Sequence, residues 1–174
     1  RESFLAASTR FQELLKRKEP PKTQSEGLAL QQSLDAAAKG FGKAAEQEPE
    51  NPLIRFAYAG FLSAMGEIEI CREEFAAAHR LAPSIPRLSS ALYEADLRTN
   101  HYAECLSLAE SEVARHPESP MGWISRGQAR IPLGDFEGAI ADLEKADKMP
   151  IDSATAKFVG NLLQTARPLL AAWP

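Results

Sequence analysis

The sequence predicts an all-α protein, and three features of its composition indicate this fold class. Alanine and leucine are the two commonest residue types in the chain, and both are among the best helix formers. Valine, isoleucine and threonine, which favour strands, make up only 15 of the 174 residues. The chain also contains 12 prolines, which helix interiors tolerate poorly. We therefore expect the prolines to lie between helices, in a chain whose length fits one domain.

The prolines recur with a fixed period. Three pairs share the spacing Pro-x-x-Pro, and each pair follows the previous one after the same interval. The recurring prolines are Pro49 and Pro52, Pro83 and Pro86, Pro117 and Pro120, and a final Pro150. The interval matches the period of about 34 residues that is typical of a helix-turn-helix repeat. Proline-rich ligands of SH3 or WW domains are the alternative, but they need extended exposed segments, whereas these pairs separate alanine-rich amphipathic stretches.

The repeat at residues 120–151 carries the clearest motif. It runs Trp123, Gly127, Gly134-Asp135-Phe136, Ala139-Ile140, Leu143 and Ala146. This order of aromatic, small and bulky residues resembles the tetratricopeptide repeat (TPR) family. We expect Trp123 to fill the space between the two helices of the repeat, and Gly127 to be small where the helices cross. Gly134 can adopt the positive φ that ends the first helix, and Asp135 can cap the second.

Two residues of this repeat depart from the pattern. Arg130 stands where an apolar residue is usual, and Pro132 should end the first helix about a turn early. Two earlier repeats, at residues 52–85 and 86–119, keep the same frame. Three repeats are about the minimum for a stable stack, because each buries its apolar face only against its neighbours.

The turns of the two earlier repeats contain Gly66 and Asn100, the two residue types that most readily adopt left-handed backbone conformations. The resemblance implies a right-handed TPR-like helical-hairpin solenoid of about four hairpins plus a terminal helix.

The flanks continue the same architecture. Residues 1–51 are expected to form an atypical helical hairpin with a long loop at 18–27, which is rich in Pro, Lys, Ser and Thr. Residues 152–174 should form a capping helix and an apolar tail, with Pro168 kinking or ending the helix. The apolar tail Leu169–Trp173 either folds back onto the stack or indicates a chain cut from a longer protein, and a first residue other than Met also fits such a cut.

Sequence motifs do not favour catalysis. There is no phosphate-binding G-x-x-x-x-G-K-[ST], no G-x-G-x-x-G, no H-E-x-x-H and no C-x-x-C. The separations between His79, His101 and His116 fit no standard zinc pattern, so we expect solvated or capping histidines. The sequence therefore predicts no enzyme activity, catalytic residue, cofactor or metal.

Charge and hydropathy exclude two further classes of partner. The formal net charge of −4 argues against a nucleic-acid groove, and no apolar run approaches the roughly 20 residues that span a bilayer.

Cys71 and Cys105 are separated by one repeat period and stand at equivalent small positions of adjacent repeats. We expect two buried thiols rather than a disulfide, because equivalent helices lie about 8–10 Å apart. Buried thiols slightly favour the reducing cytoplasm, although the compartment stays open.

The resemblance implies that the first helices of the repeats line a concave groove. The residues predicted to line it are Leu53, Phe56, Arg87, Leu97, Arg98, Met121, Ile124, Gln128 and Ile131. Chaperone-binding TPR domains hold a C-terminal carboxylate in this groove with Lys, Asn and Arg. The matching positions here carry Phe56, Gly60, Ala91, Met121 and Ser125. A chaperone-tail adaptor is therefore not expected.

The groove is mainly apolar, which predicts a non-enzymatic module that binds an apolar or amphipathic segment of a partner protein or peptide. Alternatively, the N-terminal helix or the C-terminal tail fills the groove from within the chain. The chain could also be a regulatory or scaffold region of a larger enzyme or of a secretion or assembly protein, with catalysis outside these residues. Apolar end helices could further stack between copies and give a homo-oligomer.

Overall fold

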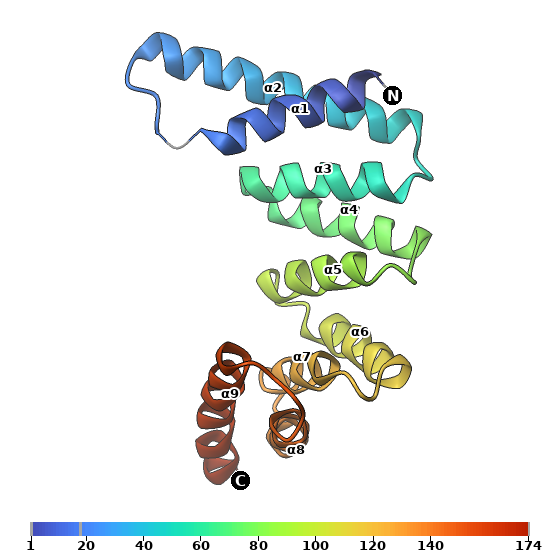
Figure 1. Cartoon of the computed structure of the whole chain (residues 1–174), viewed down its shortest axis with the longest axis vertical. Helices are drawn as coiled ribbons and strands as arrows, with labels where there is room; N and C mark the ends of the chain where they lie inside the picture. The colour runs from blue at the N-terminus through green and yellow to red at the C-terminus, as the bar shows by residue number, and fades with distance from the viewer. Residues whose placement is uncertain (1, 18, 174) are drawn as a thin grey trace. The chain divides into compact units, whose positions relative to one another are not determined.

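The computed structural model describes residues 2–17 and 19–173, and the described residues form nine helices and no strand (Figure 1). The helices are α1 (Glu2–Lys16), α2 (Gln24–Gln47), α3 (Pro52–Met65), α4 (Ile68–Leu81), α5 (Pro86–Arg98), α6 (Tyr102–Arg115), α7 (Pro120–Arg130), α8 (Phe136–Asp147) and α9 (Ser153–Ala172). The prediction of an all-α fold is confirmed.

The chain divides into two compact units, Arg1–Ala95 and Asp96–Pro174, rather than the single domain that its length predicts. A stack of helical hairpins permits such a division, because each hairpin packs only against its neighbours and no central core holds the whole chain together. In the first unit α1 packs on α2 and α3 on α4, and in the second α7 packs on α8 and α8 on α9.

Aromatic side chains form the core of the first unit. Phe41 of α2 is almost fully buried, and its ring forms T-shaped contacts with Phe4 and Phe11 of α1, with centroids 6.0 and 6.2 Å away. On its other side Phe41 contacts Phe61 at 5.4 Å and stacks on Tyr58 at 6.3 Å. These contacts tie three helices together, because each aromatic ring buries a large apolar area and adds favourable ring geometry.

The loop between α1 and α2 is shorter than expected. The sequence predicts a loop at 18–27, whereas α2 begins at Gln24. The side chain of Thr23 accepts a hydrogen bond from the backbone N–H of Glu26 at 3.2 Å. The carboxylate of Glu26 in turn accepts one from the backbone N–H of Lys22 at 2.8 Å. This reciprocal cap starts the helix earlier than the loop-like composition indicates.

The predicted turn residues adopt the predicted conformations. Gly66 and Gly134 have φ of 84° and 82°, and Asn100 has φ of 60°. Asp135 caps α8, since its side chain accepts a hydrogen bond from the backbone N–H of Gly138 at 2.9 Å. These four positions confirm the repeat register across both units. The predicted burial of Cys71 and Cys105 is confirmed as well.

Pro132 and Pro168 differ in whether they end a helix. Helix α7 ends two residues before Pro132, as expected, and is shorter than α3. Of the two effects expected of Pro168, a kink or an end of the terminal helix, the end does not occur, because α9 continues to Ala172. Trp173 then packs edge to face on Phe136 of α8, with ring centroids 5.4 Å apart. This contact joins the end of α9 to α8 although a proline removes one backbone donor of α9, while Leu169, Leu170 and Trp173 keep exposed apolar surface.

The closeness of the α7–α8 crossing gives a test of the fold. A Cβ at Gly127 would lie 2.8 Å from Leu143 Cγ and 3.1 Å from the carbonyl oxygen of Ala139, whereas a Cβ at Gly160 in α9 would meet nothing within 4 Å. We expect Gly127→Ala to lower the free energy of unfolding by about 1–3 kcal/mol through overpacking. Gly160→Ala should raise it by up to about 1 kcal/mol through helix propensity.

Urea denaturation followed by circular dichroism measures both changes. Equal effects of the two substitutions would contradict the close crossing at residue 127.

Candidate functional site

The nine residues predicted to line the groove divide between the two units, and in the first unit the structure brings two of them together. Arg87 of α5 is exposed, and its Cζ lies 5.1 Å from the centroid of the Phe56 ring. The same ring is half-buried and tilts against Phe75 of α4 at 5.4 Å. Leu53, one turn before Phe56, is 62% exposed. Leu53, Phe56 and Arg87 are called the α3–α5 patch from here on.

The opposite face of α3 is held against neighbouring helices by polar contacts. Arg55 Nη1 pairs with Glu74 of α4 at 2.8 Å, and Arg55 Nε donates to the carbonyl oxygen of Pro49 at 2.7 Å. Burial raises the pKa of the Tyr58 hydroxyl above its ordinary value, and the charges of Glu74 and Glu46 raise it further. These contacts fix the rotation of α3 and leave the Leu53 side of its first turn to solvent.

In the second unit the predicted groove residues differ in exposure. Met121, in the first turn of α7, is 56% exposed. Arg98 is exposed as well, whereas Leu97 and Gln128 are half-buried. Met121 therefore presents the largest apolar surface among the predicted groove residues of this unit.

The prediction that Ile124 faces an open groove is wrong. Ile124 is 2% exposed and belongs to a core cluster with Leu143 of α8 and Val159 of α9. Ile131 is half-buried against the same cluster. Residues of the terminal helix α9 complete this cluster, because a helix stack must cap its last apolar face. Among the described residues, neither the N-terminal helix nor the tail Leu169–Trp173 contributes a residue to this cluster.

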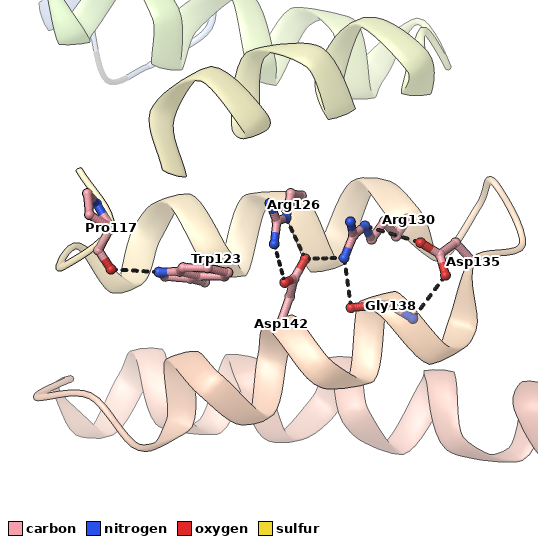
Figure 2. Close-up of polar contacts among 7 residues, drawn as sticks. All are labelled: Pro117, Trp123, Arg126, Arg130, Asp135, Gly138 and Asp142. Carbon is pink, nitrogen blue, oxygen red and sulfur yellow. Dashed lines mark hydrogen bonds and ion pairs between the residues drawn. The ribbon is translucent and has the colours of Figure 1, made fainter. Parts of the chain in front are cut away.

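A buried ionic network, which the sequence did not predict, joins α7 to α8 (Figure 2). Asp142 is 3% exposed. Arg126 donates two hydrogen bonds to the Asp142 carboxylate, from Nε to Oδ2 at 2.8 Å and from Nη2 to Oδ1 at 2.7 Å. Arg130 adds a third from Nη1 to Oδ2 at 2.8 Å. The hydrogen bond to Asp142 raises the pKa of the Arg126 guanidinium above its ordinary value.

The network continues to the turn between α7 and α8. Arg130 Nη1 also donates to the carbonyl oxygen of Gly138 at 3.1 Å. Its Nε lies 3.2 Å from Asp135 Oδ2, although this buried nitrogen makes no hydrogen bond in the described part of the chain. Arg130 therefore replaces the usual apolar contact of the repeat with an ionic one. The only sequence signal for it was the departure of Arg130 from the family pattern.

Trp123 lies beside this network (Figure 2). Its indole Nε1 donates to the carbonyl oxygen of Pro117 at 2.9 Å. Lys145 Nζ lies 3.5 Å from a ring centroid of Trp123, and Arg126 Cζ lies 4.8 Å away. The half-buried ring also packs against the core of the unit, which confirms that Trp123 fills the space between α7 and α8.

The polar groups of this network are engaged in holding two helices together. The carboxylate of Asp142 accepts three hydrogen bonds from two guanidinium groups, so the arrangement serves packing. Within residues 2–17 and 19–173, no group of three or more His, Cys, Asp or Glu side chains is placed to hold a metal ion. No helix of the described residues is both long and apolar enough to cross a bilayer.

The three histidines lie near helix ends and make short-range contacts. His79 Nδ1 is 3.3 Å from Ser89 Oγ, and His101 Nδ1 is 2.8 Å from Thr99 Oγ1. His101 and His116 occupy the N-cap and C-cap positions of α6. The side chain of His101 makes no capping hydrogen bond, and at His116 it is the backbone N–H that bonds to the carbonyl oxygen of Glu112.

Solved helical-repeat structures share this fold. "MamA 41-end from Desulfovibrio magneticus RS-1" is 16% identical with a TM-score of 0.63, and the match covers 99% of this chain and 98% of that one. A second MamA crystal structure is 11% identical with a TM-score of 0.59, over 88% of this chain and 98% of the other. Yeast Tom70 is 15% identical with a TM-score of 0.62, over 82% of this chain and 31% of the Tom70 chain.

MamA and Tom70 contain TPR helical repeats, so the comparisons show that this chain has a TPR-like solenoid fold. No protein-family model matches the sequence, and no curated protein sequence matches it.

The ionic network gives a second test. We expect Asp142→Ala to lower the free energy of unfolding by about 3–5 kcal/mol, because it leaves Arg126 and Arg130 partly buried without their shared anion. Glu144 of α8 pairs at the surface with Arg167 at 3.0 Å, and Glu144→Ala should cost less than about 1 kcal/mol.

Chemical denaturation monitored by tryptophan fluorescence compares the two variants. A loss at Asp142 no larger than the loss at Glu144 would show that the network does not hold α7 on α8.

Proposed function

We propose that the chain is a non-enzymatic protein-binding module whose contact residues follow the proline that begins each first helix. The observation that carries the proposal is the exposure of this position in three successive repeats. Pro52, Pro86 and Pro120 are the first residues of α3, α5 and α7. The residues after them, Leu53, Arg87 and Met121, are all exposed.

Physical chemistry supports binding at two of these positions. A single exposed leucine is ordinary on a protein surface, but exposure at the same position of different repeats indicates a surface that the fold leaves uncovered. Full burial of a leucine or methionine side chain contributes about 1.5–3 kcal/mol, and methionine adapts to partners of different shape. Leu53 is therefore the apolar anchor that we propose in the first unit, and Met121 is the one that we propose in the second.

Other predicted groove residues contribute less in this proposal. Phe56 offers only the part of its ring that Phe75 and Arg87 leave exposed, and Leu97 and Gln128 are half-buried. Ile124 and Ile131 are excluded because they belong to the core under α9. The same surface would serve a regulatory or scaffold region of a larger protein whose catalytic part lies elsewhere.

Self-association through the end helix is a second candidate function. Helix α9 and the residue after it expose four large apolar side chains, namely Phe158, Leu169, Leu170 and Trp173. Such side chains on an end helix are suited to stacking against a second copy. Sedimentation at several protein concentrations measures this association, and a concentration-independent monomer would exclude it.

The proposed surface is tested best at Leu53. Phe56→Glu is a poor choice because the Phe56 ring packs on Phe75, so its effects on folding and binding would be mixed. Leu53→Glu changes a side chain that is 62% exposed, and Leu28→Glu on α2 makes the same change at a leucine that is 61% exposed. We expect Leu53→Glu to abolish peptide binding and Leu28→Glu to preserve it.

The probe is a library of random peptides, each long enough for about four helical turns, displayed with their C-termini fused to a carrier and selected on the full chain. Binding of the enriched peptides is then measured by fluorescence anisotropy on the wild type and both variants. The proposal is contradicted if no peptide is enriched, or if Leu53→Glu binds as well as Leu28→Glu.

A further inference from the structure

Arg87, the cation of the α3–α5 patch, lies in a part of the sequence that is unusually poor in acid. The chain contains 24 Asp and Glu residues and has a net charge of −4. Residues 75–93, which run from the middle of α4 to the middle of α5, contain no Asp or Glu. The same stretch contains Arg80 and Arg87, so it is locally cationic within an acidic chain. Opposite charge attracts a partner to such a region.

Within this stretch, Arg87 is a cation without an internal anion. Its guanidinium is exposed and stacks over the ring of Phe56, and among the residues that the structure describes it has no ion pair. Arg55, on the other face of α3, pairs instead with Glu74 at 2.8 Å. Stacking on an aromatic ring orients the planar guanidinium while leaving its N–H groups to bind a carboxylate.

The start of α5 adds to this positive potential. The first turn of α5 carries no acidic residue, and the same holds for α3 and α7, the other two helices that begin a repeat. The partial positive charge of the α5 N-terminus is therefore not offset within its own first turn. Glu94 lies two turns after Arg87, about 10 Å further along the helix, so it disfavours an anion towards the middle of α5.

We infer that the α3–α5 patch binds a protein segment that presents a side-chain carboxylate next to an apolar side chain. This inference rests on the proposed function and names the chemistry of the partner. The carboxylate pairs with Arg87 at the start of α5, and the apolar side chain covers Leu53 and the exposed part of Phe56. Leu53 and Phe56 are three residues apart on one helix and share a face, so both contacts fit within one or two turns of a bound amphipathic segment.

Charge reversal at Arg87 tests the inference with the same displayed library. Because the C-termini of the peptides are fused to the carrier, only side-chain carboxylates can pair with Arg87. Selection is run on the wild type, on Arg87→Glu and on Arg10→Glu, which makes the same change at an exposed arginine of α1. We expect the wild type and Arg10→Glu to enrich peptides with Asp or Glu beside an apolar residue, and Arg87→Glu to lose this preference.

Affinities of one enriched peptide quantify the contact. We expect binding to weaken about fivefold on Arg87→Glu and on replacing the peptide's Glu by Gln, which is the scale of a partly exposed ion pair. Arg87→Lys should lose less than Arg87→Gln because it keeps the charge. Raising the salt concentration from about 0.05 to about 0.5 M should weaken wild-type binding and leave the binding of Arg87→Gln nearly unchanged.

The outcomes separate this inference from the proposed function. Enriched peptides without an excess of acid, or acidic peptides that bind Arg87→Glu and the wild type equally, would overturn the inference. The proposed function would stand in that case if Leu53→Glu still abolished binding. A library that yields no binder would overturn both. Circular dichroism shows whether each variant is folded, and Arg87→Gln and Arg87→Lys carry the comparison if Arg87→Glu is not.

Discussion

The close approach of paired helices at small residues is the constraint on which the structure depends. The crossing at Gly127 leaves no room for a Cβ beside Leu143, and alanines without exposed surface lie in the packed faces of the other helices, among them Ala37, Ala59, Ala78, Ala139, Ala146 and Ala166. A small side chain buries little apolar area, so stability must come from the large residues beside it. Phe41 has this role in the first unit and Leu143 in the second.

Close packing also determines which residues stand at the turns between helices, and which contact Arg130 makes in place of an apolar one. Left-handed residues at the turns let one helix end and the next begin within a few residues. In the last repeat, α7 ends early before Pro132, and Arg130 supplies an ionic contact at its end. Burying charge costs desolvation energy unless hydrogen bonds satisfy it. Three such bonds to Asp142, two of them in a bidentate pair with Arg126, meet that requirement.

The features that sequence could predict are those that depend on local geometry or on the period of the repeat. The left-handed conformations of Gly66 and Asn100 could be predicted because a turn needs particular residue types at a fixed offset. The pairing of Asp142 could not be predicted, since its partners lie on another helix and many exposed carboxylates share its sequence context. Ile124 was misplaced for a related reason: its repeat position indicates a groove, but its exposure depends on where α9 packs.

The same reasoning applies to the first two residues of each repeat. The proline that begins each first helix is fixed by helix geometry, because the first turn needs no N–H donor from it. The residue after that proline is exposed in each of three repeats, so the core does not require it to be apolar. Leucine, arginine and methionine occupy it at Leu53, Arg87 and Met121. A regular fold thereby repeats one exposed position while the chemistry of its side chain differs from repeat to repeat.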